Sequence, residues 1–202
     1  MDAKRYAPAT ERNRLPILEV LQRYLPSTGN VLEIAGGTGE HGVFFASQFP
    51  KVQWYPSDPN PEARASIAAW RNEYTGDNLQ PPLEIDVMDA SWSSQVDSIT
   101  INTVVNINMI HISPWAACEG LIQGAGKLLS SGEILYLYGP YKREGKHTAP
   151  SNAAFDISLQ SRNPLWGVRD LETVVAEANK NGLSLQEVVE MPANNLSVIF
   201  GK

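Results

Sequence analysis

A short apolar run that ends in a cluster of glycines constrains the fold of this chain more than any other feature. Residues 31–34 read Val-Leu-Glu-Ile, residues 35–39 read Ala-Gly-Gly-Thr-Gly, and residues 43–46 read Val-Phe-Phe-Ala. Glycine lets backbone N–H groups approach a ligand closely, and a helix N-terminus adds partial positive charge. The pattern therefore predicts a strand over 30–35, a helix over about 40–48, and a nucleotide-like ligand at the turn between them.

Two acidic residues bear on the identity of that ligand. Glu33 lies two residues before the turn. A carboxylate at this position would repel a phosphate, but it would attract a ligand that carries an amino group or a sulfonium. Asp58 follows Gly39 by 19 residues, where an acid that binds ribose is expected. The spacing Gly37-x-Gly39-x-x-Gly42 also fits a nicotinamide dinucleotide, which stays open. Glu33 favours S-adenosylmethionine.

Composition indicates one α/β domain over residues 1–202. The formal net charge of −6 argues against nucleic acid as a partner. No apolar run approaches the ~20 residues that span a bilayer, and residues 1–14 lack the apolar core of a signal peptide. A single cysteine, Cys118, and three widely spaced histidines indicate a reducing compartment and no metal site. We expect a cytoplasmic protein without a membrane partner, and the oligomeric state stays open.

Hydrophobic periodicity predicts alternating strands and helices along the rest of the chain. We expect an amphipathic helix over 15–25 with Pro16 in its first turn, and a helix that Ser113 caps. The remaining helices are expected over 61–74 and 171–182, and the remaining strands over 52–55, 83–87, within 99–108, 133–139, 183–191 and 196–200. The last two strands are joined by four residues only, so they must form an antiparallel hairpin.

The segment Glu33–Gly39 resembles the first motif of class I S-adenosylmethionine-dependent methyltransferases, with Ala35 where the first glycine is usual. This resemblance places Asp58 as the acceptor for the ribose hydroxyls and Asp86 against the adenine amino group. It implies a Rossmann-like seven-stranded sheet, mostly parallel with a C-terminal antiparallel hairpin, and helices on both faces.

Four further segments are similar to an uncharacterised group of methyltransferase-like proteins found in bacteria and animals: Arg12–Leu18, Asn108–Trp115, Ser151–Asp156 and Trp166–Leu171. The likeness covers almost the full chain but supplies no substrate. The residues expected to bind the cofactor are Arg12, Asn13, Glu33, Ala35, Gly36, Gly37, Gly39, Asp58, Asp86 and Asn106.

The acceptor is expected beyond the strands within 99–108 and over 133–139, because ligands of open α/β sheets lie outside the carboxyl ends of the strands. Residues 140–168 form a long connection and a possible lid, and the N-terminal arm and helix cover 1–26. Residues 140–170 carry five Lys or Arg against three Asp or Glu, which favours a small, anionic acceptor. The candidate catalytic residues are His111, Asp156 and Tyr141, and the candidate acceptor-binding residues are Asn108, Arg143, Asn152 and Arg162.

Methyl transfer needs a base only when the nucleophile starts protonated, and His111 is the first candidate because its ordinary pKa lies near 6.5. A buried structural histidine is the plain alternative for this residue. Two other functions stay open: a nicotinamide-dependent reductase, and a methyltransferase-like protein that binds the cofactor without turnover.

Overall fold

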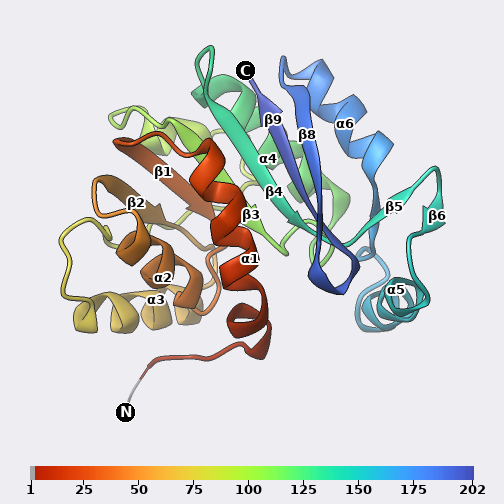
Figure 1. The fold of residues 1–202 in the computed structure, drawn as a ribbon, viewed down its shortest axis with the longest axis horizontal. Coiled ribbons are helices and arrows are strands. Elements are labelled where there is room, and N and C mark those ends of the chain that lie inside the picture. The colour runs from red at the N-terminus through yellow and green to blue at the C-terminus, as the bar shows by residue number, and fades with distance from the viewer. Residues whose placement is uncertain (1–2) are drawn as a thin grey trace. The chain divides into compact units, whose positions relative to one another are not determined.

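The structure is a computed structural model that describes residues 3–202 (Figure 1). The chain divides into two compact units. The first unit comprises the chain up to Asp86 together with Ser94–Asn106, and the second comprises Val87–Ser93 together with Ile107–Lys202.

The first unit contains parallel strands in the order β2-β1-β3. Their bounds are Gly29–Ile34 for β1, Val52–Pro56 for β2 and Thr103–Ile107 for β3, the last residue of β3 belonging to the second unit. Each matches a predicted strand. Most of their residues are buried, as expected of apolar, β-branched strands in a parallel sheet. Because the strands are parallel, Ile34 and Pro56 end at the same edge, from which the glycine turn begins.

Three helices pack in succession in this unit: α1 (Pro8–Tyr24) against α2 (Glu40–Gln48), and α2 against α3 (Pro61–Glu73). The helices α2 and α3 follow the prediction. The helix α1 begins seven residues earlier than predicted, so the placement of Pro16 in a first turn is wrong. Pro16 lies inside the helix, where it has no N–H for the carbonyl of Arg12.

The predicted strand over 83–87 does not form, so the described residues contribute six strands to the larger sheet, where seven are predicted. Leu83 makes only an isolated bridge to Ser57, and Leu79 makes another to Trp54. The two residues before Leu83 are prolines, which have no N–H to continue a ladder along β2. The segment therefore follows β2 through single contacts instead of pairing with it continuously.

The second unit contains the predicted C-terminal hairpin. Strand β9 (Asn195–Gly201) pairs antiparallel with both β8 (Ser184–Met191) and β4 (Ile134–Gly139), in the order β4-β9-β8. The hairpin turn contains the short helix η2 (Pro192–Asn194). Helices α4 (Trp115–Leu128) and α6 (Leu171–Lys180) pack on each other, and α6 also packs on β8.

Residues 140–168, which the sequence indicates as a long connection, contain two short strands and a helix. They contain β5 (Tyr141–Arg143), β6 (Lys146–His147) and α5 (Pro150–Arg162), and β5 also pairs with β7 (Arg169–Asp170). Ser113 does not cap α4 as predicted, because its hydroxyl donates to the Met109 carbonyl and the cap position is occupied by Pro114.

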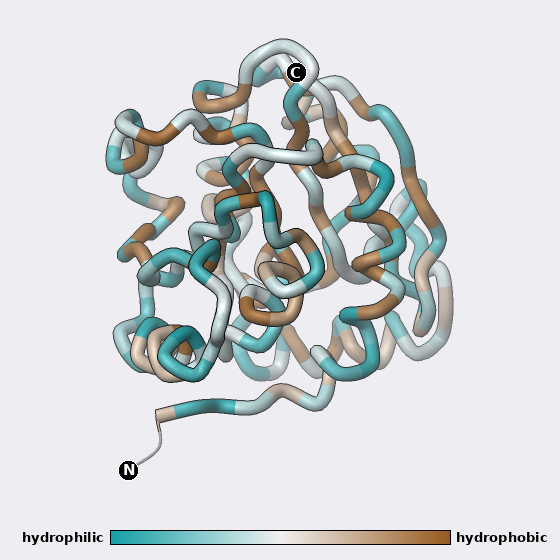
Figure 2. Tube along the Cα trace, turned by 60° about the vertical axis from the view of Figure 1, so that its left-hand side comes forward, coloured by the Kyte–Doolittle hydropathy of each residue, from teal (hydrophilic) through white to brown (hydrophobic). Residues whose placement is uncertain are grey.

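Hydrophobic and hydrophilic residues alternate along the trace, and the segment that leads into α1 contains a hydrophilic stretch (Figure 2). Within residues 3–202 every helix is too short or too polar to cross a membrane. The short helix η1 (Trp92–Val96) crosses the boundary between the two units in sequence.

Candidate functional site

The turn after β1 has three residues in the left-handed region: Ala35 (φ 57°), Gly37 (φ 59°) and Gly39 (φ 89°). A Cβ on Gly39 would lie 2.8 Å from the Cα of Ile67 in α3, so the close packing of this helix requires glycine there. A Cβ on Gly37 would have no atom within 4 Å. The turn is thus packed tightly on one side and open beside Gly37, as a ligand cradle requires.

Glu33 lies beneath this turn. Its side chain is 2% exposed, and its Oε2 accepts a hydrogen bond of 2.8 Å from the Trp54 indole. A Cβ on Gly42 would lie 2.8 Å from the same oxygen, so the glycine leaves room for the carboxyl group. Burial raises the pKa of Glu33 to about 7; the Trp54 bond opposes this rise and the charge of Asp58 adds to it. Glu33 therefore supports the turn from below, and its direct contact with a ligand stays a prediction.

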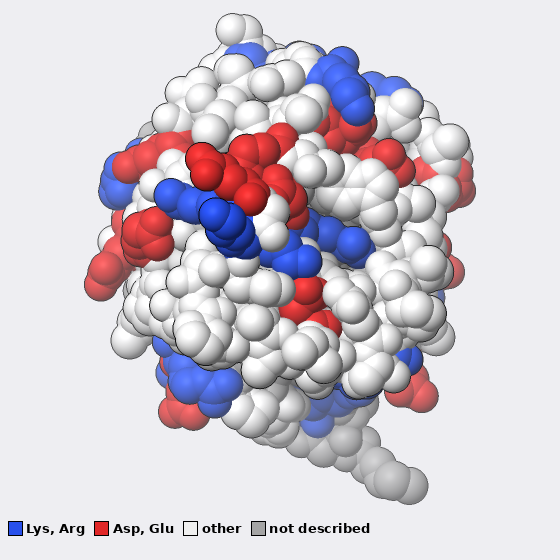
Figure 3. Space-filling view, turned by 90° about the vertical axis from the view of Figure 1, so that its right-hand side faces the viewer, with Lys and Arg blue, Asp and Glu red and all other residues white. Residues whose placement is uncertain are grey.

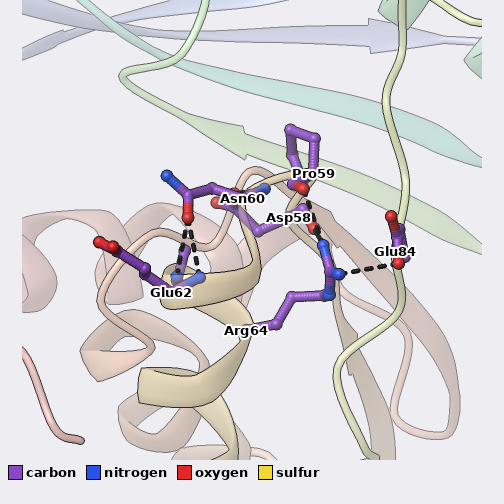
Figure 4. Close-up of polar contacts among 7 residues, drawn as sticks. Asp58, Pro59, Asn60, Glu62, Arg64 and Glu84 are labelled. Atoms are coloured by element: carbon purple, nitrogen blue, oxygen red, sulfur yellow. Dashed lines mark hydrogen bonds and ion pairs between the residues drawn. The ribbon is translucent and has the colours of Figure 1, made fainter.

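Asp58 lies beside the turn, directly after β2. Its Oδ2 accepts a hydrogen bond of 3.0 Å from the Gly37 N–H, and its Oδ1 accepts one of 2.9 Å from the Asn60 N–H. The carboxylate is 7% exposed. Asn60 in turn caps α3 by accepting from Glu62 and Ala63, so the loop that carries Asp58 is continuous with the start of the helix (Figure 4). The structure thus brings together the glycine turn and the predicted ribose acid.

Asn106 and Asn13 also lie near elements of the turn. Asn106 donates from Nδ2 to the Ile34 carbonyl at 2.9 Å, and its Oδ1 is buried with no hydrogen-bond partner. Asn13 on α1 bonds through Oδ1 to His41 Nε2 at 2.8 Å, at the start of α2. A buried acceptor without a partner is costly unless a ligand supplies a donor, which makes Asn106 a candidate contact.

Two further predicted cofactor residues, Arg12 on α1 and Asp86 after the 83–85 segment, are exposed. Their contact with a cofactor stays a prediction.

In the second unit, His111 is 2% exposed and its Nδ1 is buried without a partner. Its ring meets that of Phe155 edge-on at 5.7 Å, and a Cβ on Gly139 would lie 3.0 Å from Nδ1. Burial, and after it the Arg169 guanidinium, lower the pKa of His111 to about 3. The imidazole is therefore neutral at physiological pH and can accept a proton, but it is a weak base.

Asp156 forms a dense polar cluster in the same unit. Its carboxylate accepts from the Lys142 ammonium at 2.8 Å and from the Val168 N–H at 2.8 Å, and it lies 3.2 Å from His147 Nε2. Burial alone would raise the pKa of Asp156, but the bonds from Lys142 and Val168 outweigh it and lower the pKa below its ordinary value. A carboxylate held in this way orients its partners more readily than it removes a proton.

Tyr141, the third catalytic candidate, is fully buried, and its hydroxyl has no partner. Burial raises the pKa of Tyr141 well above its ordinary value, so the phenol stays protonated at neutral pH.

The four predicted acceptor-binding residues each contact different partners. Asn108 (φ 64°) donates its N–H to the Tyr138 carbonyl, and Asn152 donates to Thr148 and to the Asn194 carbonyl. Arg143 pairs with Glu190 at 3.0 Å, and Arg162 lies over the Trp166 ring. These four residues do not hydrogen-bond to one another.

Acidic side chains interleave with basic ones on the face shown in Figure 3. Pairing of Lys142 with Asp156 and of Arg143 with Glu190 accounts for two of the cations counted over 140–170. Fewer cationic side chains of residues 140–170 are therefore available to an anionic ligand than the count of five Lys or Arg indicates.

A family described as a protein of unknown function, DUF938, matches residues 4–202. The chain belongs to this family. The DUF938 chain is also similar in structure to the solved methyltransferases described next, each below 25% identity, and this similarity shows the α/β methyltransferase fold.

An O-methyltransferase family protein from Burkholderia thailandensis superposes with a TM-score of 0.78 at 16% identity, over 96% of this chain and 57% of that one. Human N-acetylserotonin methyltransferase, solved in complex with S-adenosylmethionine, gives 0.76 at 12% identity over 96% and 52%. The calicheamicin-biosynthesis methyltransferase CalO1, solved with S-adenosylhomocysteine, gives 0.74 at 15% identity over 96% and 54%. This chain thus spans a little over half the length of these structures.

Sequence reasoning missed several residues that shape the glycine turn of the DUF938 chain. Glu40 accepts from the Thr38 hydroxyl and from the Ala7 N–H, and Ser66 donates to the Thr38 carbonyl. Arg64 reaches the backbone of the Asp58 loop. A capping pattern could have suggested Glu40, which follows the turn directly, but the contacts of Ser66 and Arg64 depend on how α3 packs.

Proposed function

We propose that this DUF938 chain is an S-adenosylmethionine-dependent methyltransferase that acts on a small, anionic acceptor. The observation that carries the proposal is the hydrogen bond between Asp58 and the Gly37 N–H. It places a nearly buried carboxylate beside the open face of a glycine turn, at the carboxyl ends of parallel strands, where open α/β sheets bind nucleotides.

The C-terminal hairpin favours this cofactor over a nicotinamide dinucleotide. In the second unit β9 lies between β4 and β8 and runs antiparallel to both, which is the arrangement expected of class I methyltransferases. Two of the similar structures were solved with S-adenosylmethionine or S-adenosylhomocysteine bound.

The residues of the first unit fit such a cofactor chemically. Asp58 can accept from ribose hydroxyls, and the buried Oδ1 of Asn106 can accept from an N–H or ammonium group. S-adenosylmethionine, when bound, supplies a methyl group already activated on a sulfonium. The protein then has to orient the reactants and exclude water.

The candidate acceptor residues of the second unit suit a nucleophile that is acidic or already ionised. His111 is neutral and weakly basic, so it can align a nucleophile by accepting a hydrogen bond. Arg162 and Lys146 are exposed and can attract an anionic group.

The same observations favour a second candidate function, cofactor binding without turnover. His111 is a weak base, Asp156 is held by Lys142 and His147, and Tyr141 stays protonated. A protein that senses the cofactor or serves as a partner subunit would need no stronger base.

Calorimetric titration with S-adenosylhomocysteine and with NADH tests the cofactor. We expect dissociation in the low micromolar range for S-adenosylhomocysteine, about −8 kcal/mol. Asp58→Asn should weaken it by about 1–3 kcal/mol, because the ribose hydroxyls lose a charged acceptor. Asp77→Asn, which changes an exposed acid in the turn after α3, is the matched control and should bind normally.

Tighter binding of NADH than of S-adenosylhomocysteine would refute the methyltransferase proposal. Labelled methyl transferred from S-adenosylmethionine into the small-molecule fraction of a cell extract would support the acceptor class. Label found in macromolecules alone would contradict that class, and no label with intact cofactor binding would favour the second candidate.

A further inference from the structure

Arg64, in the first turns of α3, reaches back over the loop that precedes its own helix (Figure 4). Its Nη1 donates to the Asp58 carbonyl at 3.0 Å and to the Pro59 carbonyl at 2.7 Å. Its Nη2 donates to Glu84 Oε2 at 2.7 Å. One guanidinium group thus binds two backbone carbonyls and one carboxylate, and its side chain is only 19% exposed.

These contacts join two segments far apart in sequence. The Asp58 loop carries the predicted ribose acid, and Glu84 lies two residues before Asp86, the predicted adenine acid. The backbone contacts between the segments are few: the Asp58 N–H donates to the Leu83 carbonyl at 3.1 Å, and the Leu83 N–H donates to the Pro56 carbonyl at 2.9 Å. Since no continuous ladder holds them together, the guanidinium supplies a large part of the connection.

We infer that Arg64 is a positioning residue for the adenosine half of the cofactor site, because it fixes the Asp58 loop relative to the segment that leads to Asp86. This inference rests on the proposed function. Arg64 itself donates to protein groups and acts on the ligand through Asp58.

The planar guanidinium matters here as much as its charge. Its two terminal nitrogens serve acceptors on different segments at once, whereas a lysine ammonium is a single point that cannot bridge them with the same geometry. Arg64→Lys should therefore keep attraction to Glu84 but lose the hold on the Asp58 loop.

The same helix offers a matched control. Arg71 donates from Nε to the Leu79 carbonyl at 2.8 Å, and so also ties α3 to a backbone carbonyl after the helix. None of the contacts of Arg71 reaches Asp58 or Glu84. Arg71→Ala removes a single bond from an arginine side chain of α3 to a backbone carbonyl, and it reports the cost of losing such a bond away from the Asp58 loop.

The experiment measures binding of S-adenosylhomocysteine and of its 2′-deoxy analogue to the full chain and to the Ala and Lys variants of Arg64 and the Ala variant of Arg71. We expect the wild type to prefer the ribose form by about tenfold, as for one hydrogen bond to a charged group. Both Arg64 variants should bind S-adenosylhomocysteine about 5- to 30-fold more weakly and lose most of the ribose preference. Arg71→Ala should keep the wild-type affinity and preference.

Amide hydrogen exchange without ligand tests the physical basis. In the Arg64 variants the amides of Asp58 and Leu83 should exchange faster together, and Arg71→Ala should leave both unchanged. Binding within twofold of wild type with intact ribose preference in Arg64→Ala would overturn the inference, as would full recovery in Arg64→Lys or equal loss in Arg71→Ala. A wild type that binds no S-adenosylhomocysteine would refute the proposed function itself, and this inference with it.

Discussion

Replacement of Glu33 by glutamine should change how the stability of the chain depends on pH. Burial raises the pKa of Glu33 from 4.5 to about 7 in the folded chain. Because the folded pKa is above the unfolded one, the native state holds a proton that the unfolded state has lost between these values. The contribution of Glu33 to stability is therefore fully present below pH 4.5 and is lost as pH rises through about 7.

The magnitude follows from the two pKa values. One pKa unit corresponds to about 1.4 kcal/mol, so the change from 4.5 to about 7 amounts to about 3 kcal/mol. Glutamine keeps an acceptor oxygen for the Trp54 indole and does not titrate. Wild type should lose about 3 kcal/mol relative to Glu33→Gln between pH 4.5 and pH 8, whatever constant offset the new amide introduces.

Urea unfolding of both proteins across this range, without ligand, measures the difference directly. Two histidines act in the opposite direction: burial lowers the pKa of His41 to about 4 and that of His111 to about 3. Their contributions are present above pH 6.5 and are lost as pH falls, but they occur in both proteins and cancel in the comparison. A stability difference that is independent of pH would refute the reasoning, because it would mean that Glu33 is ionised in the folded chain.

Two further substitutions test packing and charge. Gly39→Ala should destabilise the chain by about 1–3 kcal/mol more than Gly132→Ala, as measured by urea unfolding. Both glycines have φ near 90°, but only the Cβ at Gly39 would meet Ile67 at 2.8 Å, so an equal cost at both would show that backbone strain alone matters. Asp156→Asn should cost about 1–3 kcal/mol, since a partly exposed lysine and histidine lose their shared carboxylate. Arg143→Gln, which breaks an exposed ion pair, should cost less than about 0.5 kcal/mol, and the reverse order would contradict the assignment of Asp156 to a buried cluster.

The sequence predicts the first unit best where a single local rule decides the structure. The apolar run and glycines of 31–39 specify strand, turn and helix because Gly37 and Gly39 adopt a positive φ at little steric cost, and Ala35 is the one residue of the turn with a side chain that also does so. The failed strand over 83–87 shows the limit of periodicity. Leu83, Ile85 and Val87 alternate as a half-buried strand would, but the two prolines before Leu83 have no N–H, so the pairing with β2 is interrupted between Leu79 and Leu83.

Ordered structure within 140–168 was harder to predict because its strands are very short. Glu144 and Gly145 both have positive φ and join β5 to β6 as a two-residue hairpin turn. The dipeptide is a weak form of the Asp-Gly signal, and strands of three and two residues are too short to show alternation. The strand β7 also pairs with β5, although α5 lies between the two strands in the sequence. No local sequence pattern encodes such a contact.

The same distinction applies to the candidate site. The positions of some of its residues follow from local sequence, whereas the contacts of others depend on how the helices pack. The position of Asp58 beside the glycine turn could be predicted, because the acid that follows the second strand of a nucleotide-binding unit lies at a characteristic sequence separation from the turn. Arg64 could not, since an arginine on a helix surface is usually solvated and nothing in the sequence shows that it turns back over its own N-terminus. Only the structure shows that Arg64 is the side-chain donor to the Asp58 and Pro59 carbonyls of this loop. Each of those carbonyls needs a partner, and a side chain that serves two of them holds the loop in place.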